Sequence, residues 1–245
     1  MNVYQTLLDR RSHGRLHMTL LDPDKQAAGE AGRIAAEAAK SGTDAIMIGG
    51  STGVTQEKVD ATVLAIKASA KVPTILFPAS AANLSRHADA LYFMSLLNSR
   101  DPRLIVGEQR RAAPVVKAWG LETIPMAYLV VEPGMRAGEV GRADPIPRSD
   151  AEAAVGYALA AQLLGMKLVY LEAGSGAPEP VPSAMIAAVR AAIDIPLVVG
   201  GGIRTAEAAG AVARAGADIV VTGTVVERAK DGETLRRIIA SVKAV

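Results

Sequence analysis

Three apolar stretches, 167–171, 197–199 and 219–221, each run directly into a turn of small residues, and a segment with helical periodicity follows each turn. Glycines in such turns let the backbone approach a ligand closely and leave N–H groups free to donate. A helix that begins just afterwards adds positive partial charge at its first turn. Three turns of this kind, side by side, predict a cradle for one phosphate group.

Two carboxylates accompany these turns. Glu172 stands between the apolar stretch 167–171 and its glycine turn, and Asp22 follows the apolar stretch 16–21. Taken alone, Asp22-Pro23 is typical of a turn or a helix N-cap, and a carboxylate such as Glu172 could form an ion pair at the rim of a sheet. The functional alternatives are a hard oxygen ligand for a divalent cation at Asp22 and a general base at Glu172.

The elements that would position these residues alternate regularly along the chain. Strands are expected at 16–21, 44–48, 74–77, 90–94, 123–131, 167–171, 197–199 and 219–221. Helices are expected at 1–11, 27–40, 55–68, 103–119, 150–165, 182–192, 205–215 and 232–244. Continuous β-branched runs separated by helices predict parallel strands that are buried on both faces.

Eight such units in one chain of 245 residues predict an α/β fold, a TIM (β/α)8 barrel that forms a single domain over 1–245. One crossover is irregular, because 78–89 is too short and too polar for a full helix. Active sites of these barrels lie at the carboxyl ends of the strands. The following residues fall at such ends: Asp22, Ser51, Glu132, Glu172, Gly201 and Gly223.

Composition excludes several other classes of protein. The chain has 50% hydrophobic residues, 3% aromatic residues and a net charge of +2, with no basic run, which argues against nucleic-acid binding. The absence of cysteine excludes disulfides, thiolate zinc sites and a cysteine nucleophile. No stretch approaches about 18 uninterrupted apolar residues, so no membrane span is expected. We expect a soluble, cytoplasmic protein.

In these residues the chain resembles the geranylgeranylglyceryl phosphate synthase family, whose bacterial relatives use heptaprenyl donors. The long segment 130–148 makes it similar to the larger archaeal subgroup. The sequence departs from the family at one point. After Phe77-Pro78 the family often has Gly-Asn, whereas this chain has Ala79-Ser80. This difference concerns the shape of the prenyl channel. The motifs that carry the resemblance are 20–25, 49–51, 94–98, 128–134, 170–176, 200–204 and 222–227.

The resemblance implies a prenyltransferase of archaeal membrane lipid biosynthesis that joins sn-glycerol 1-phosphate to geranylgeranyl diphosphate, with Mg²⁺ as cofactor. It assigns the metal to Asp22 and Ser51, and catalysis to Glu172. It also implies the irregular third crossover and a homo-oligomer (a dimer or a hexamer). Among partners we expect transient membrane contact and no nucleic acid. It assigns glycerol phosphate binding to Tyr170, Leu171, Glu172, Ala173, Gly174, Ser175, Gly176, Gly201, Gly202, Gly223 and Thr224.

Within that resemblance, Glu172 would orient or deprotonate the glycerol hydroxyl that attacks the allylic carbon, and the prenyl tail would lie in an apolar groove over 78–89. Tyr128 could line the prenyl slot, form a hydrogen bond with the phosphate or pack in the core, and Arg204 could be a surface charge. The alternatives are an isomerase or lyase on a phosphate-binding barrel and a scaffold without catalysis. No lysine ends a strand, which argues against Schiff-base chemistry.

Overall fold

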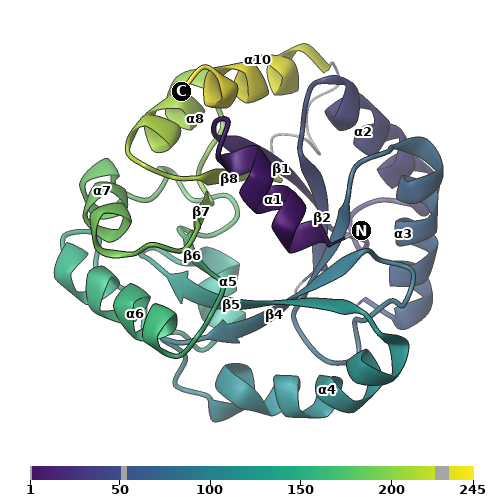
Figure 1. The fold of residues 1–245 in the computed structure, drawn as a ribbon, viewed down its shortest axis with the longest axis horizontal. Helices are drawn as coiled ribbons and strands as arrows, with labels where there is room; N and C mark the ends of the chain where they lie inside the picture. Colours follow the sequence, from purple (N-terminus) through teal and green to yellow (C-terminus); the bar gives the residue numbers. More distant parts are fainter. Residues whose placement is uncertain (1, 51–53, 224–231) are drawn as a thin grey trace.

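The computed structural model describes residues 2–50, 54–223 and 232–245. Eight parallel strands close into a barrel in sequence order, because β8 pairs with β1 (Figure 1). This confirms the predicted TIM barrel. The strands are β1 Leu16–Leu21, β2 Ala45–Gly50, β3 Thr74–Pro78, β4 Ala90–Leu96, β5 Glu122–Val130, β6 Leu168–Glu172, β7 Leu197–Gly200 and β8 Ile219–Thr222.

Helices surround the barrel, and polar residues at their starts fix where several of them begin. The Asp150 carboxylate accepts from the Ala153 N–H at 2.9 Å, which confirms the predicted N-cap. Thr55 and Thr205 cap α3 and α8 in the same way. The surrounding helices are α2 Ala28–Lys40, α3 Gln56–Ser69, α4 Glu108–Trp119, α6 Ala151–Leu163, α7 Ser183–Ala192, α8 Ala206–Arg214 and α10 Gly232–Lys243.

No helix lies between β3 and β4, as predicted, and residues 79–89 run irregularly across this side of the barrel. Polar contacts hold the segment in place. The Ala81 N–H donates to the Glu108 carboxylate at 2.7 Å, and the Asn83 side chain donates to the Val54 carbonyl at 2.7 Å. The barrel is therefore covered here by a thin layer of chain instead of by a helix.

Two elements differ from the prediction. The expected helix 103–119 begins with a π-helical turn, η1 (Arg103–Gly107), whose Ile105 carbonyl accepts from the Ser95 hydroxyl at 2.6 Å. A short helix, α5 (Met135–Val140), interrupts the loop expected after β5. The glycines and prolines around α5 obscure its periodicity, and it is stabilised by tertiary contacts that no local pattern reveals.

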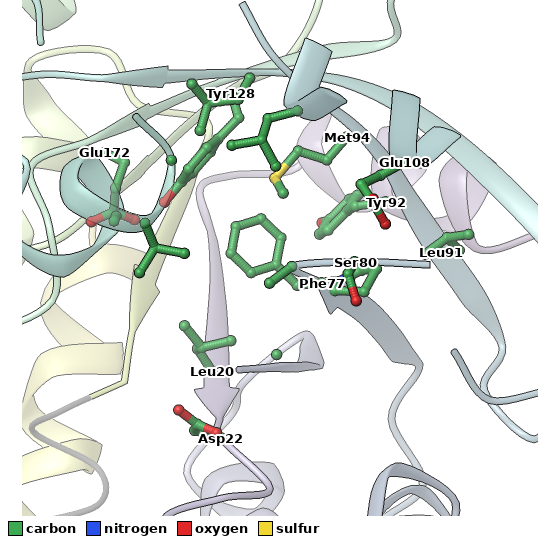
Figure 2. Close-up of a pocket in the computed structure, with 18 of the residues that line it drawn as sticks. Leu20, Asp22, Phe77, Ser80, Leu91, Tyr92, Met94, Glu108, Tyr128 and Glu172 are labelled. Atoms are coloured by element: carbon green, nitrogen blue, oxygen red, sulfur yellow. The ribbon is translucent and has the colours of Figure 1, made fainter. Parts of the chain in front are cut away.

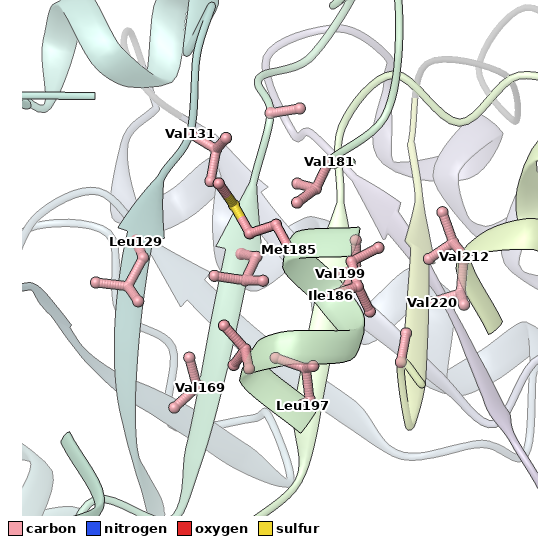
Figure 3. Packing of buried hydrophobic residues seen from close by; sticks show 14 of the residues in the cluster. Leu129, Val131, Val169, Val181, Met185, Ile186, Leu197, Val199, Val212 and Val220 are labelled. Atoms are coloured by element: carbon pink, nitrogen blue, oxygen red, sulfur yellow. The ribbon is translucent and has the colours of Figure 1, made fainter. Parts of the chain in front are cut away.

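Buried side chains form one layer inside the barrel and others between the barrel and its helices. In the outer layer, Val169 and Leu197 of the strands lie in one cluster with Met185 and Ile186 of α7 (Figure 3). None of the helices in the described ranges is long and apolar enough to cross a membrane.

The helix α1 (Val3–Arg11) lies across the end of the barrel where the strands begin (Figure 1). Its Val3 and Leu7 side chains are 0% and 3% exposed and belong to the cluster that fills the barrel. The Glu122 carboxylate accepts from the Val3 and Tyr4 N–H groups at 2.6 and 2.8 Å, which satisfies donors at the start of α1. This end of the barrel is therefore closed.

Leu7→Ala should destabilise the protein by roughly 2–5 kcal/mol, because it leaves a cavity at the closed end of the barrel. Leu64→Ala, at a side chain of α3 that is 50% exposed, makes the same chemical change and should cost less. Chemical denaturation of both variants gives the comparison. Equal losses of unfolding free energy would contradict the sealing role of α1.

Candidate active site

At the opposite end of the barrel, where the strands finish, a cavity of about 540 Å³ opens among the predicted site residues. Glu172 ends β6, while Asp22 and Gly223 directly follow β1 and β8. Together with Ser175, these residues contribute to the cavity wall. The barrel topology thus brings together residues that are distant in the sequence.

Glu172 is the centre of the polar part of this cavity, and it is only 6% exposed. One carboxylate oxygen accepts from the Gly174 N–H at 2.6 Å, and the carboxylate also forms hydrogen bonds with the side chains of Tyr128 and Tyr170. Burial raises the pKa of the Glu172 carboxyl, and these hydrogen bonds oppose the rise. A carboxylate with a raised pKa is a stronger base than an exposed glutamate.

Four aromatic side chains line the barrel beneath the cavity. Phe77 and Tyr170 are stacked with ring centres 5.7 Å apart, while Tyr128 meets both edge-on, at 5.4 Å from Phe77 and 5.2 Å from Tyr170. Tyr92 completes the group, edge-on to Phe77 at 6.3 Å (Figure 2). Burial, together with the Glu172 charge, raises the pKa values of Tyr128 and Tyr170, so both hydroxyls stay protonated and can donate to Glu172.

The glycines at the end of β7 provide the space that this network occupies. A Cβ atom on Gly200 would lie 2.1 Å from the Tyr170 hydroxyl, and a Cβ atom on Gly201 would lie 2.3 Å from a Glu172 carboxylate oxygen. Gly201 also has a φ of +83°, a conformation that glycine adopts most readily. These positions therefore require glycine for the packing of Glu172 and Tyr170, independently of any contact with phosphate.

The run 170–176 does not act as a unit. Side chains alternate along a strand, so Tyr170 and Glu172 face the barrel interior, whereas Leu171 and Ala173 are buried in the outer cluster with α7. The Ala173 N–H donates to the Gly200 carbonyl, and its carbonyl accepts from the Gly134 N–H. The side chains of Leu171 and Ala173 therefore have a packing role, and the assignment of these two residues to the substrate site stays a prediction.

Arg204 is more than a surface charge. Its guanidinium donates to the Gly176 and Ala177 carbonyls at 2.6 and 2.8 Å, which joins the turn after β7 to the turn after β6. The position of Arg204 two residues after the triple glycine 200–202 is the only sign of this contact in the sequence. The two turns predicted to hold phosphate are thus fixed to each other.

Asp22 has the surroundings expected of a metal ligand with few protein partners. It lines the cavity together with Asp24, and its carboxylate accepts from the Asp24 N–H at 3.0 Å. Partial burial raises the pKa of the Asp22 carboxyl. In the described ranges no group of three or more histidine, cysteine, aspartate or glutamate residues converges. Mg²⁺ commonly takes only one or two carboxylates from the protein, so Asp22 fits this ion.

Two predicted residues, Ser51 and Thr224, lie outside the described residues. Of the remaining glycines, Gly202 has a φ of +70°, and a Cβ atom there would lie 2.3 Å from the Glu179 carbonyl oxygen. Gly223 has room for a side chain, since the atom nearest to a Cβ atom there, the Leu20 carbonyl oxygen, would be 3.4 Å away.

From Glu172 and Asp22 the cavity continues as an apolar groove past Phe77 towards Ser80, Leu91 and Glu108 (Figure 2). Its far part lies over the irregular segment between β3 and β4, where the resemblance placed the prenyl tail. The apolar residues that line it are Leu20, Phe77, Pro78, Ala79, Ala81, Leu84, Leu91, Tyr92, Phe93, Met94, Leu96, Leu104, Ala112, Ala137 and Val140.

Gly201→Ala should destabilise the protein by about 1–3 kcal/mol more than Gly176→Ala, because only the first adds a methyl group to a filled space. The φ angles of the two glycines are nearly the same, +83° and +84°, and nothing lies within 4 Å of a Cβ atom on Gly176. Backbone strain is therefore matched in the pair. Denaturation midpoints measure the difference, and equal shifts would show that Glu172 can move aside freely.

Glu172→Gln should raise the melting temperature at pH 8 and lose this advantage as the pH is lowered. A raised folded-state pKa means that the native protein is favoured when the carboxyl is neutral and loses that stability as the pH rises through the raised value. Calorimetry between pH 4 and pH 8 measures the effect, with the exposed Glu139→Gln as a control. If the glutamine variant were less stable than the wild type at every pH, burial of the charged Glu172 carboxylate would not cost stability, contrary to this prediction.

Comparison with known proteins gives a consistent result. The PcrB family matches residues 8–243. The geranylgeranylglyceryl phosphate synthase of Thermococcus gammatolerans is 57% identical over 91% of this chain and 88% of its own length. That of Pyrococcus horikoshii is 52% identical over 94% of this chain and 90% of its own length.

Among solved structures, the fold is similar to that of (S)-3-O-geranylgeranylglyceryl phosphate synthase from Thermoplasma acidophilum, crystallised with its substrate sn-glycerol-1-phosphate. The TM-score is 0.97 and the identity 48%, and the match covers 100% of both chains. With this family match, this level of identity and a barrel of the same shape, the chain belongs to the PcrB family.

Proposed function

We propose that this chain is a geranylgeranylglyceryl phosphate synthase, a prenyltransferase that forms the ether bond between sn-glycerol 1-phosphate and geranylgeranyl diphosphate. The observation that carries the proposal is the position of one buried carboxylate, Glu172. It lies between turns suited to a phosphate and a long apolar groove, so a polar and an apolar substrate can meet there.

The glycerol phosphate would bind at the turns after β6, β7 and β8. Backbone N–H groups of these turns and the Ser175 side chain provide hydrogen-bonding groups for the phosphate, and α7 and α8 begin close behind the first two turns. Arg204 keeps the turns after β6 and β7 together. Its guanidinium donates to backbone carbonyl groups, so its role here is to position the turns and not to contact the phosphate. The residues proposed for this site are Tyr170, Glu172, Gly174, Ser175, Gly176, Gly201, Gly202, Gly223 and, outside the described residues, Thr224.

The reaction is an alkyl transfer to a hydroxyl group. The glycerol hydroxyl oxygen forms a bond with the allylic carbon, the bond from that carbon to the diphosphate oxygen breaks, and the electron pair leaves with diphosphate. The hydroxyl proton goes to the carboxylate of Glu172. Tyr128 and Tyr170 hold this carboxylate in place, and its raised pKa makes it a more effective proton acceptor.

Asp22 would hold Mg²⁺ at the diphosphate, together with Ser51, which lies outside the described residues. When bound, the ion neutralises charge on the diphosphate and so favours its departure. Asp22 has room for substrate oxygens because it faces the cavity.

The isoprenoid chain would occupy the apolar groove. Transfer from water is favourable by about 0.8 kcal/mol for each buried CH2 group, so the tail supplies much of the binding free energy. A groove over the irregular segment leaves the barrel interior filled by its own side chains, and it orients the allylic end of the donor towards Glu172.

We also propose that residues 1–245 act as one prenyltransferase domain, in the cytoplasm and as a homo-oligomer, a dimer or a hexamer. The water-soluble acceptor supports the location. Exposed leucines at the C-terminal end of α6 and just after it, Leu159, Leu163 and Leu164, support self-association.

The alternatives fit the site less well. An isomerase or lyase on a phosphate-binding barrel needs paired acid–base groups or a lysine facing its substrate, and it has no use for a long apolar groove. A scaffold without catalysis would not need a buried glutamate with a raised pKa, because that group makes the folded protein less stable at neutral pH.

The decisive experiment supplies labelled sn-glycerol 1-phosphate and geranylgeranyl diphosphate with Mg²⁺ or with EDTA. We expect a prenyl ether only with the metal, only traces from sn-glycerol 3-phosphate, and a loss of about 100-fold or more in turnover for Glu172→Gln, in keeping with the typical contribution of a general base. A scaffold would bind glycerol phosphate and consume no donor. Turnover of the glutamine variant near that of the wild type would remove Glu172 from the mechanism.

A further inference from the structure

The outer edge of the groove carries apolar side chains that face solvent. Val106 of η1 is 63% exposed, and Met135 and Val140 of α5 are 38% and 40% exposed. Both elements also reach into the groove, η1 through Leu104 and α5 through Val140 and neighbouring residues. The exposed groups therefore stand beside the entrance to the site.

Hydrogen bonds join the two elements into one surface. The Ser99 hydroxyl donates to the Gly141 carbonyl at 2.7 Å, and the Arg100 N–H donates to the Arg142 carbonyl at 2.9 Å. The Arg142 guanidinium lies 3.6 Å from the Asp101 carboxylate. Residues 99–106 and 135–142 thus form a continuous surface, which we call the rim.

The rim is also rich in arginine. The side chains of Arg100, Arg103 and Arg142 are 73%, 70% and 66% exposed. Among the described residues their ion-pair partners are two carboxylates, Asp101 and Asp144. The rim also holds Arg136 and Glu139, so its arginines outnumber its carboxylates.

The Arg100–Asp144 pair is exposed on both sides, and such pairs contribute little to stability and are screened by salt. Arg100 can therefore turn to a phosphate group of a partner at small cost. Arg103 and Arg142 share the one Asp101 carboxylate, which leaves one positive charge unbalanced.

Isolated exposed apolar residues are normal on a protein surface. Apolar groups interspersed with exposed arginines are instead typical of surfaces that rest in the interface of an anionic bilayer, where the apolar groups enter the acyl boundary and the cations meet lipid phosphates. The rim lies at the groove entrance, which also favours contact with a bilayer. A long isoprenoid and its ether product are far more soluble in a membrane than in water.

We infer that the rim docks the protein on an anionic lipid bilayer, so that the groove opens towards the membrane that supplies the isoprenoid donor and receives the product. This inference rests on the proposed function. α5 lies on the far side of the barrel from α1 (Figure 1), so a docked molecule would turn its closed end to the solvent. A second copy of the chain is the competing occupant of the rim.

Flotation with vesicles tests the inference directly. The full-length protein should float with vesicles of mixed phosphatidylglycerol and phosphatidylcholine, and flotation should weaken about tenfold with pure phosphatidylcholine or at 1 M salt, where charge interactions are screened. Val106→Asp, and separately Arg100→Gln with Arg103→Gln, should reduce flotation to a similar degree. The matched control is Leu64→Asp, which places the same charge at a side chain of α3 that is 50% exposed and lies outside the rim.

An activity measurement separates this inference from the proposed function. With the donor in detergent micelles, Val106→Asp should equal the wild type, because its side chain does not line the groove; with the donor in anionic vesicles it should be several-fold slower. Absence of product under both conditions would reject the proposed function itself. Membrane docking would be overturned if the rim variants left flotation unaffected, or if Leu64→Asp reduced it to the same degree. A change of oligomeric mass in light scattering in place of an effect on flotation would also overturn it.

Discussion

The arrangement of this site depends on keeping one carboxylate away from water. Glu172 is almost fully buried and would be unfavourable there without its three hydrogen-bond donors, the Gly174 N–H and the side chains of Tyr128 and Tyr170. Each donor depends on another part of the structure. The tyrosines are held in the aromatic group around Phe77, and Gly200 and Gly201 leave room for the hydroxyl and the carboxylate.

The same constraint gives the glycine-rich turns two roles. The chain must pass close to Glu172 and must also leave N–H groups for a phosphate, and only residues without a side chain meet both requirements. Gly201 shows the first role directly, because a Cβ atom at this position would lie 2.3 Å from the Glu172 carboxylate. A motif commonly associated with phosphate binding is thus also part of the support for the base.

Much of the fold could be predicted from the sequence, because parallel strands buried on both faces and helices with polar caps leave local patterns. β1 was predicted with its observed bounds, and the missing helix between β3 and β4 followed from a segment too short and polar to form one. η1 and α5 could not be predicted, since contacts with distant segments stabilise them. The convergence of Glu172, Asp22 and Gly223 followed from the barrel alone.

The parts of the site that remained hidden depend on register and on side-chain direction. Tyr128 lies opposite Tyr170 on the neighbouring strand, and nothing in either segment states this pairing. The same alternation that turns Tyr170 inward places Leu171 in the outer layer, so a continuous motif mixes site and packing residues. Arg204 acts through carbonyl groups of another turn, a contact that exists only after folding.

Because no helix lies between β3 and β4, the stability of the barrel and the shape of the groove depend on different parts of the chain. The strands of the closed ring keep their mutual pairing whatever lies on this side, while one part of the groove wall is an irregular segment fixed through a few polar contacts, such as Glu108 with Ala81. Sequence change can therefore reshape the groove without altering the ring that holds Glu172. Such an architecture lets a lineage adapt to isoprenoids of new dimensions while its catalytic chemistry is conserved.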